Sequence, residues 1–486
     1  MIAYYQKAIA VLSHNTLIIT SPSTMSTLHK FADPGVATPV VNSEPTVNVF
    51  TGEEAHHILG TTRFLKQWDF LYDKCPWGTV FQSRHFVLPW YLLNKSDYLV
   101  IIVKAEYEGQ LIGLLTLTKS KYNRLIMAAG IGGAEYQTWL SVPAFSDYFI
   151  KESLLKLQVL FPGHDINLYN TPPETPLEWV NSENYWKRHC ILKPLKRPLM
   201  DLRLPEVSKV FRKKQFREKL NRLKRLGVVE FDKIRTLDEF ASIIDELADQ
   251  SDFRKGARYN HKEFRGDPAR KQFLVDLFEQ GVLHVTTLKL DGEIIASIAA
   301  TSGKKWVHLA GLNTHSAVYA RYSPGLINFV MLGQLLLEEG MHIFDLTPGG
   351  DAYKERLATN HDVVHELYVS GRAKTFAKKK LVEPILKRVK VNLHNRGITP
   401  RLLKYEVIRV KDRIALSKRD FTRFLSWHYI RTGISAQQVV YKFQINSSLD
   451  RKPVKVNSAS DLLDYNSDYG LQTRWDFLGD AMRKLE

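Results

Sequence analysis

The chain has 486 residues, of which 44% are apolar and 24% are charged. This length leaves room for two or three domains, and the composition is that of a globular protein with large buried cores. The sequence contains only two cysteines, Cys75 and Cys190, which lie far apart. They form neither a disulfide scaffold nor a CxxC metal site, and they are typical of a reducing cytoplasm, where we expect the protein. We expect no metal ion and no permanently bound cofactor.

The formal net charge of +17 is high. Such a charge favours anionic partners, among them nucleotide cofactors, anionic lipid, tRNA and acidic polymers. A basic protein without a nucleic-acid role is the simpler interpretation. No run of about 18 apolar residues occurs, so we expect no membrane-spanning helix.

Residues 1–46 are predicted to be a disordered N-terminal segment. The first twenty residues are mildly apolar but lack the basic start of a secretory signal. The rest of the segment is rich in Ser, Thr, Pro and Val, which favours disorder. Either Met1 or Met25 fits as the biological start.

Residues 47–205 are predicted to form one α/β module. Apolar residues at helical spacing alternate with short apolar runs, and Gly109 marks a hairpin turn. The glycine run 130–133 lacks the spacing of a phosphate loop, so we interpret it as a bend. The expected order is a helix (53–72), a second helix carrying Trp90 and Tyr91, four strands (98–107, 111–119, 126–133, 137–140), a helix (146–160) and a strand (165–169).

Residues 206–230 are predicted to form one basic linker helix that ends at Gly227. Its basic face is either simply solvated or an electrostatic clamp for a phosphate-bearing substrate or polyanion, and both interpretations stay open. Its basic residues are Arg212, Lys213, Lys214, Arg217, Lys219, Arg222, Lys224 and Arg225.

Residues 231–370 are predicted to form a second α/β module. Asp291-Gly292 is the strongest hairpin signal in the chain. The segment 256–258 is expected to be a loop. The expected order is two helices (237–253, 267–280), three strands (282–290, 293–300, 304–310), a helix that begins near Pro324, and two strands (343–346, 363–370).

Residues 371–432 are strongly basic with helical spacing, and 433–486 resemble a small tail with a strand and a closing helix. The basic helices are expected either to pack on the body of the protein or to lie against anionic lipid. The second possibility would place the protein at the periphery of the inner membrane.

Residues 306–357 hold the features that point to a function. A helix that begins at Pro324 exposes backbone N–H groups and the positive end of its dipole, which suits a phosphate. Asp345 ends a predicted strand, where open α/β sheets place their ligands. Tyr353 and Lys354 follow a double glycine, where the backbone can turn tightly.

These residues resemble the signature of the CelD-like acetyltransferases, which are associated with bacterial cellulose and exopolysaccharide synthesis and are similar to the GNAT superfamily. The chain also resembles the Fem-type transferases, which move amino acids from aminoacyl-tRNA onto peptidoglycan precursors with two GNAT-like modules. The resemblance spans roughly residues 81–368. It implies an α/β fold of tandem GNAT-like modules with mixed sheets flanked by helices, followed here by a basic helical extension. It is carried by Phe81-Gln82-Ser83, Tyr322-Ser323-Pro324-Gly325-Leu326, Phe344-Asp345-Leu346, Gly349-Gly350-Asp351 and Ala352-Tyr353-Lys354.

The resemblance implies that the helix start binds the pyrophosphate of acyl-CoA as a co-substrate. Pro324 has no N–H, so the neighbouring amides would bind it. The usual glycine spacing of GNAT enzymes is absent, which leaves an aminoacyl-tRNA donor open. The residues implied in donor binding are Arg321, Ser323, Pro324, Gly325 and Leu326.

Acyl transfer requires a held carbonyl, a donor to the oxyanion and a route for one proton. We expect Asp345, Tyr353, Lys354 and His308 to serve catalysis, although a histidine in the middle of a strand, as His308 is, is more often a core residue than a base. Arg254, Arg258, Trp306, Tyr319 and Tyr322 are the candidates for substrate binding. The predicted activity is acyl transfer to an amine or hydroxyl of an envelope polysaccharide precursor. A Fem-like transferase and a non-catalytic partner of a polysaccharide synthase are the alternatives.

Overall fold

The structure is a computed structural model that describes residues 44–259, 262–382 and 385. Most of the predicted disordered segment 1–46, nearly all of the basic region 371–432 and the whole tail 433–486 lie outside the described residues. Within residues 371–432, the segment 373–382 is helical. Among the described residues, no helix is both long and apolar enough to cross a membrane.

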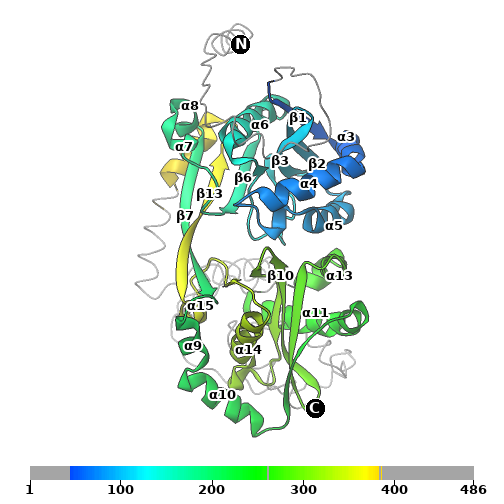
Figure 1. The fold of residues 1–486 in the computed structure, drawn as a ribbon, viewed down its shortest axis with the longest axis vertical. Coiled ribbons are helices and arrows are strands. Elements are labelled where there is room, and N and C mark those ends of the chain that lie inside the picture. The colour runs from blue at the N-terminus through cyan, green and yellow to red at the C-terminus, as the bar shows by residue number, and fades with distance from the viewer. Residues whose placement is uncertain (1–43, 260–261, 383–384, 386–486) are drawn as a thin grey trace, which may run out of the picture.

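One mixed sheet of thirteen strands runs through both predicted modules, with helices packed on it (Figure 1). The strand order is β1-β2-β3-β4-β6-β13-β7-β12-β11-β10-β9-β8, and β5 pairs with β3 beside this path. A mixed sheet flanked by helices confirms the predicted α/β class.

The first module follows most of the predicted order, with several changes. The strands Thr46–Thr51 and Cys190–Asp201 are not predicted, and the strand expected at 137–140 is reduced to Leu140–Ser141. Gly60 ends a first helix, so the helix predicted over 53–72 is two helices, α3 and α4. The strand predicted at 126–133 stops at Ala128, because Gly130 and Gly132 adopt positive φ and turn the chain. The elements are β1 (Thr46–Thr51), α3 (Gly52–Leu59), α4 (Thr62–Lys74), η1 (Val80–Gln82), α5 (Arg84–Asn94), β2 (Tyr98–Tyr107), β3 (Gln110–Ser120), β4 (Leu125–Ala128), β5 (Leu140–Ser141), η2 (Pro143–Phe145), α6 (Ser146–Leu160), β6 (Asp165–Thr171), α7 (Trp179–Ser182), α8 (Asn184–Lys187) and β7 (Cys190–Asp201).

The second module also departs from the prediction at several places, among them the strand Val229–Lys233 and the short helices Glu263–Gly266 and Ala352–Leu357, which are not predicted. The basic segment forms two helices rather than one, because Lys213 is extended between them. The loop expected at 256–258 is wrong, since Gly256 keeps a helical backbone inside α11. The elements are α9 (Glu206–Phe211), α10 (Lys214–Lys224), β8 (Val229–Lys233), α11 (Leu237–Tyr259), α12 (Glu263–Gly266), α13 (Ala269–Glu279), β9 (Leu283–Leu290), β10 (Glu293–Gly303), β11 (Trp306–His315), η3 (Ala320–Tyr322), α14 (Pro324–Glu338), β12 (Ile343–Asp345), α15 (Ala352–Leu357) and β13 (Asn360–Val369).

The two modules exchange their last strands. The strand β7 leaves the first module and pairs with β12 of the second, whereas β13 of the second module pairs with β6 of the first. In addition, β7 and β13 pair with each other over ten residues, and Figure 1 shows the two long strands side by side, reaching from one module to the other. The shared sheet ties the two modules together through backbone hydrogen bonds.

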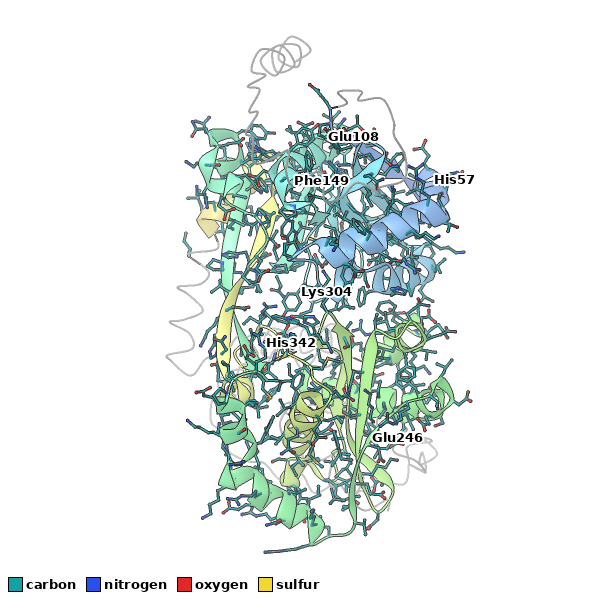
Figure 2. The ribbon with its side chains drawn as sticks, viewed as in Figure 1. His57, Glu108, Phe149, Glu246, Lys304 and His342 are labelled. Carbon is teal, nitrogen blue, oxygen red and sulfur yellow. The ribbon has the colours of Figure 1, made fainter. Side chains whose placement is uncertain are left out.

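The turn between β10 and β11 inserts into the first module. The Lys304 ammonium donates to the carbonyl of Cys75 at 2.8 Å and lies 4.3 Å from the centre of the Tyr72 ring, and Figure 2 shows Lys304 at this junction. A Cβ on Gly303 would come within 2.9 Å of the Val80 side chain, so the backbone approaches closely here. These contacts fix the loops of the first module beside the second.

Candidate active site

The strands β11 and β12 run parallel for only three residues. Trp306, Val307 and His308 pair with Ile343, Phe344 and Asp345, after which the two strands part. The strand β11 continues to His315 while β12 ends at Asp345. The carboxyl ends of parallel strands are where α/β sheets bind ligands. This parting of the strands is therefore the place around which we describe the site.

The start of α14 lies beyond the end of β11. Ser323 adopts the left-handed conformation with φ of 59°, and its hydroxyl makes no cap but accepts a hydrogen bond from Lys219 at 2.8 Å. The Leu326 amide donates to the carbonyl of Ser323 at 3.0 Å. Pro324 has no N–H, and no hydrogen bond from the Gly325 amide is recorded among the described residues. Among the amides predicted to bind phosphate here, the Gly325 N–H is therefore the one without a hydrogen-bond acceptor in the described residues.

Arg321 stands beside this helix start and is exposed. Its guanidinium lies 4.8 Å from the centre of the Tyr322 ring, which holds the positive charge near the end of η3. A basic group at this position, next to the positive end of the α14 dipole, adds to a field that attracts an anion.

Asp345 and His308 form a buried pair. The His308 ring nitrogen Nδ1 and the Asp345 carboxylate are 2.8 Å apart, and the two side chains are 2% and 0% exposed. The Thr347 amide also donates to Asp345 at 2.8 Å. Burial raises the pKa of the Asp345 carboxyl, but the hydrogen bond from His308 and the charge of Arg197 outweigh it, so the pKa lies below its usual value. Asp345 and His308, both predicted to be catalytic, are therefore buried against each other and have little access to a substrate.

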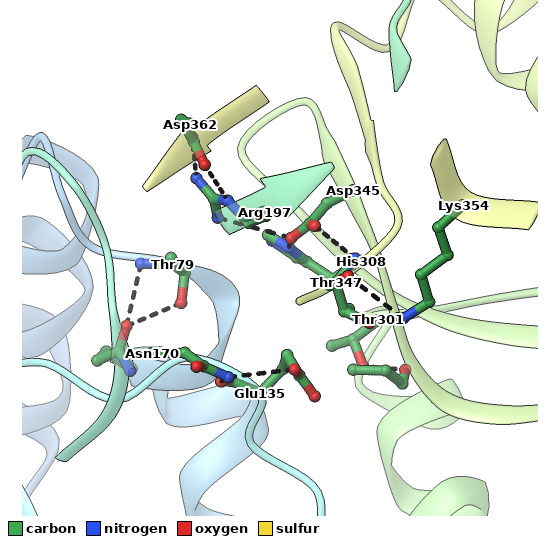
Figure 3. Close-up of polar contacts among 12 residues, drawn as sticks. Thr79, Glu135, Asn170, Arg197, Thr301, His308, Asp345, Thr347, Lys354 and Asp362 are labelled. Atoms are coloured by element: carbon green, nitrogen blue, oxygen red, sulfur yellow. Dashed lines mark hydrogen bonds and ion pairs between the residues drawn. The ribbon is translucent and has the colours of Figure 1, made fainter. Parts of the chain in front are cut away.

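Arg197 of β7 was not predicted from the sequence. It donates two hydrogen bonds to Asp362 of β13, and its Nη1 is 3.6 Å from Asp345 (Figure 3). Its guanidinium lies 4.8 Å from the centre of the Tyr136 ring and 5.1 Å from that of Trp306. Nothing in the local sequence marks this arginine, because its partners come from strands far away in the chain.

Lys354 is buried and its ammonium is held by the loop before it. It donates to the carbonyl and hydroxyl oxygens of Thr347 at 3.2 Å and 3.0 Å. A Cβ on Gly349 would lie 3.4 Å from the Lys354 Nζ, so the loop wraps closely around the ammonium. Burial lowers the pKa of Lys354, against the opposing charges of Asp351 and Glu135. We call Arg197, His308, Asp345, Thr347 and Lys354 the polar centre.

Tyr353 does not join the polar centre. Its ring lies 5.3 Å from that of Phe329 on α14, within the apolar core of the second module. The segment predicted as a turn is the helix α15, in which successive side chains point about 100° apart. The structure therefore separates Tyr353 from Lys354.

The residues predicted to bind substrate are spread over the second module. Arg254 donates to the carbonyl of Asn313 on β11 at 2.7 Å. Trp306 stacks beside His308, with ring centres 5.8 Å apart. Tyr319 donates to Glu293 at 3.1 Å, and Tyr322 lies under Arg321. The side chain of Arg258 is outside the described residues.

A loop of the first module also reaches the polar centre. Glu135 is half-buried between β4 and β5, and its carboxylate accepts a hydrogen bond from Asn170 at 3.2 Å. The ring of the next residue, Tyr136, lies 5.3 Å from that of His308, which brings this loop to the polar centre, and Figure 3 draws Glu135 with its contact to Asn170. Burial and then Asp345 raise the pKa of Glu135 to about 7, while Lys354 opposes them. A hollow of about 560 Å³ on the first module, near Arg63, includes none of these residues.

Residues 211–355 match the model of a family described as acetyltransferase (GNAT) domain. The match covers less than half of the chain and includes β11, the start of α14, β12 and Lys354. The chain thus carries an acetyltransferase domain of the GNAT type, and it is an enzyme of the acyltransferase class. No curated protein matches the chain.

The fold is similar to several solved structures. One is the C-terminal domain of a putative lysylphosphatidylglycerol synthetase from Agrobacterium fabrum, at 15% identity and a TM-score of 0.43, covering 64% of this chain and 93% of that one. Another is FemX, at 8% identity and a TM-score of 0.45, covering 63% and 96%. A third is a tandem GNAT protein from the clavulanic acid biosynthesis pathway, at 10% identity and a TM-score of 0.40. The similarity covers 67% of this chain and 99% of that one.

Proposed function

We propose that the protein transfers an acyl group from acyl-CoA to an amine or hydroxyl of an envelope polysaccharide or its precursor. The observation that carries this proposal is the match of residues 211–355 to an acetyltransferase domain, which includes the parting of β11 and β12 and every residue of the polar centre except Arg197. The polysaccharide acceptor is supported by the resemblance of the segments around Gly325 and Lys354 to CelD-like acetyltransferases. The expected location is the cytoplasm, with contact to the inner membrane as a further possibility.

In this proposal the CoA pyrophosphate lies at the start of α14. The Gly325 amide and the helix dipole would bind one phosphate, and Arg321 and Lys219 would neutralise charge around it. The thioester would then enter between the parted ends of β11 and β12. This arrangement holds the reacting carbonyl near Lys354.

The reaction itself requires little covalent help from the protein. The acceptor attacks the thioester carbonyl, a C–N or C–O bond forms, and the C–S bond breaks as the CoA thiolate leaves. Lys354 would stabilise the negative charge that develops on the oxygen or sulfur, because its buried ammonium acts in a low dielectric. Asp345, His308 and Arg197 would hold the strand ends in place.

An aminoacyl-tRNA donor is the second candidate, and one observation favours it. The start of α14 offers fewer open amides than a pyrophosphate would use, while the neighbouring helix α10 exposes basic side chains such as Arg217 and Arg222. Such a surface would bind an RNA backbone with a strong dependence on salt.

The test begins with purified protein, acetyl-CoA and two acceptor probes. Chitosan oligosaccharides offer amines and cello-oligosaccharides offer hydroxyls, and mass spectrometry reports acetylation of either. We expect acetyl-CoA to raise the melting temperature saturably and one probe to be acetylated. Lys354→Met should lower kcat about 100-fold or more. Lys66→Ala, at an exposed lysine on α4, is the matched control and should leave kcat unchanged.

Two outcomes would contradict the proposal. Retention of aminoacyl-tRNA at physiological salt, with no stabilisation by acetyl-CoA, would favour the Fem-like alternative. Binding of neither donor would favour a non-catalytic partner of a polysaccharide synthase.

A further inference from the structure

We propose that Glu135, a residue of the first module, is the general base that takes the proton from the acceptor at the polar centre of the second module. This inference rests on the proposed acyl transfer, and it makes the active site a composite of both modules. The acetyltransferase match alone does not contain it, because Glu135 lies outside residues 211–355.

The loop that carries Glu135 is fixed against the second module. Its turn is closed by the Ala134 amide, which donates to the carbonyl of Gly130 at 2.6 Å. A Cβ on Gly133 would lie 3.0 Å from the ring of Phe273 on α13, so this loop packs tightly against the second module. The position of Glu135 near the polar centre is thus part of the interface between the modules.

Asn170 holds the glutamate from the other side. Its Nδ2 donates both to the backbone carbonyl of Glu135 at 3.0 Å and to its carboxylate Oε1 at 3.2 Å. Asn170 itself has a positive φ of 49°, a conformation that asparagine tolerates better than most residues. This double contact orients the carboxylate, and no hydrogen bond to its second oxygen is recorded among the described residues.

The other carboxylates of the polar centre are already committed. Asp345 is fully buried and accepts hydrogen bonds from His308 and Thr347, and Asp362 accepts two from Arg197. Glu135, in contrast, has an oxygen for which no hydrogen bond is found among the described residues, and it is less exposed than Asp351, the other carboxylate whose charge acts on Lys354. The residue also keeps part of its surface exposed, whereas Asp345 keeps none.

The charged groups that face Glu135 set its proton affinity. They are Asp345 on β12, Lys354 on α15 and the neighbouring Tyr136. Burial, followed by the negative charge of Asp345, raises the pKa of Glu135 to about 7, and the positive charge of Lys354 limits the rise. A base with a pKa near the working pH is both largely ionised and basic enough to accept a proton.

The proposed step is balanced. The nitrogen or oxygen of the acceptor attacks the thioester carbon, and its proton passes to the Glu135 carboxylate as the new C–N or C–O bond forms. The C–S bond breaks, and its electron pair leaves with the sulfur of CoA. The thiolate then takes up a proton, which Glu135 returns through solvent, so the base is restored after each turnover.

The experiment compares Glu135→Gln with Glu183→Gln in the full-length protein, with acetyl-CoA and whichever oligosaccharide probe the wild type acetylates. Glu183 is an exposed glutamate of the first module, so its substitution controls for the loss of one carboxylate. We expect Glu135→Gln to lower kcat about 100-fold or more, with the KM for acetyl-CoA unchanged. Glu183→Gln should behave like the wild type.

The pH profile separates a base from a merely structural residue. In the wild type, kcat should rise with pH through about 7 as Glu135 loses its proton. In Glu135→Gln the residual rate should lack this rise. A ¹³C NMR titration of the Glu135 carboxyl should give the same midpoint without any acceptor being present.

The outcomes for the two proposals differ. If wild-type protein acetylates the probe and Glu135→Gln does so at a similar rate, this inference is wrong while the acyltransferase proposal stands. If Glu135→Gln lowers kcat as expected but its residual kcat still rises with pH near 7, the inference is also wrong. If the wild type transfers no acyl group at all, the proposed function itself fails, whereas the NMR midpoint would still report on the environment of Glu135.

Discussion

The two modules repeat one fold but differ at the helix start that a phosphate would occupy. In each, two parallel strands pair for three residues, Leu125–Met127 with Asp165–Asn167 in the first and Trp306–His308 with Ile343–Asp345 in the second. In the first module the start of α6 is filled. The Trp139 indole donates to the Ser146 hydroxyl at 2.9 Å, and both side chains are buried. In the second module the start of α14 carries the open Gly325 amide and the exposed Arg321.

This difference shows how two copies of a fold can divide one task. The first module keeps the packing of the fold but has placed tryptophan where an anion would lie, and Trp77 closes the same place by donating to the carbonyl of Trp139 at 2.7 Å. What the first module adds to the polar centre is the loop with Glu135 and Tyr136. We infer that one module binds the donor and the other supplies a group to the acceptor.

The largest effect should come from Arg197, which ties the modules together. Replacing it by methionine keeps much of its volume but leaves Asp345 and Asp362 without their cation, and breaking a buried ion pair costs about 3–5 kcal/mol. Urea unfolding should reveal this loss as one cooperative transition. Lys193→Met, on the same strand but half exposed, is the control and should change stability by less than about 1 kcal/mol. If Arg197→Met were equally mild, the shared centre would not hold the modules together.

A second test compares the two helix starts directly. Ser146→Ala removes the acceptor of a buried indole and should cost about 1–3 kcal/mol of stability without changing the affinity for acetyl-CoA. Ser323→Ala should weaken acetyl-CoA binding by no more than the loss of Lys219 itself does, because it removes only the hydroxyl that orients Lys219. Calorimetry should also give one acetyl-CoA per chain. Two binding sites, or a loss of affinity in Ser146→Ala, would contradict the division between the modules.

Local signals in the sequence were enough for the elements that depend on local conformation. The hairpin turns at Glu108-Gly109 and Asp291-Gly292 formed as predicted, with all four residues at positive φ. The helix beginning at Pro324 was found as well, because proline and glycine mark such a start. Asp345 ends the short strand β12 and Lys354 follows it closely in the chain, so both contact Thr347, which lies between them in sequence.

The rest of the site depends on pairings that the sequence does not encode locally. Arg197 contacts Asp345 and Asp362 because β7 crosses into the second module. No periodicity in residues 190–201 predicts that crossing. No local pattern marks Glu135, because it follows a glycine run that the sequence predicts to be a bend. Tyr353 was grouped with Lys354 because the sequence suggested a loop, whereas the helix α15 turns the two side chains apart.

The pH dependence of stability offers a smaller and independent test of Glu135. Its pKa is raised from 4.5 to about 7 in the folded protein. Below pH 4.5 both states are protonated, and as the pH rises from 4.5 to about 7 the folded state loses stability, because it resists ionisation. Glu135→Gln never ionises, so it should be more stable than the wild type by about 1–2 kcal/mol at pH 8 and equally stable near pH 4.5. A variant that is inactive but more stable at pH 8 is typical of a catalytic group, whereas a structural role would make it less stable.

The smallest expected effect is at Lys219, beside the start of α14. Its ammonium donates to Ser323 at 2.8 Å, and one partly exposed charge near a helix start contributes about 0.5–1 kcal/mol to binding an anion. Lys219→Ala should therefore weaken acetyl-CoA binding about two- to five-fold at low salt, and the difference should shrink as salt screens the charge. Lys224→Ala, in the last turn of the same helix and exposed, is the matched control. Equal affinities of the two variants for acetyl-CoA at low salt would mean that the donor phosphate does not lie at α14. The starts of α6 and α14 would then not differ in phosphate binding.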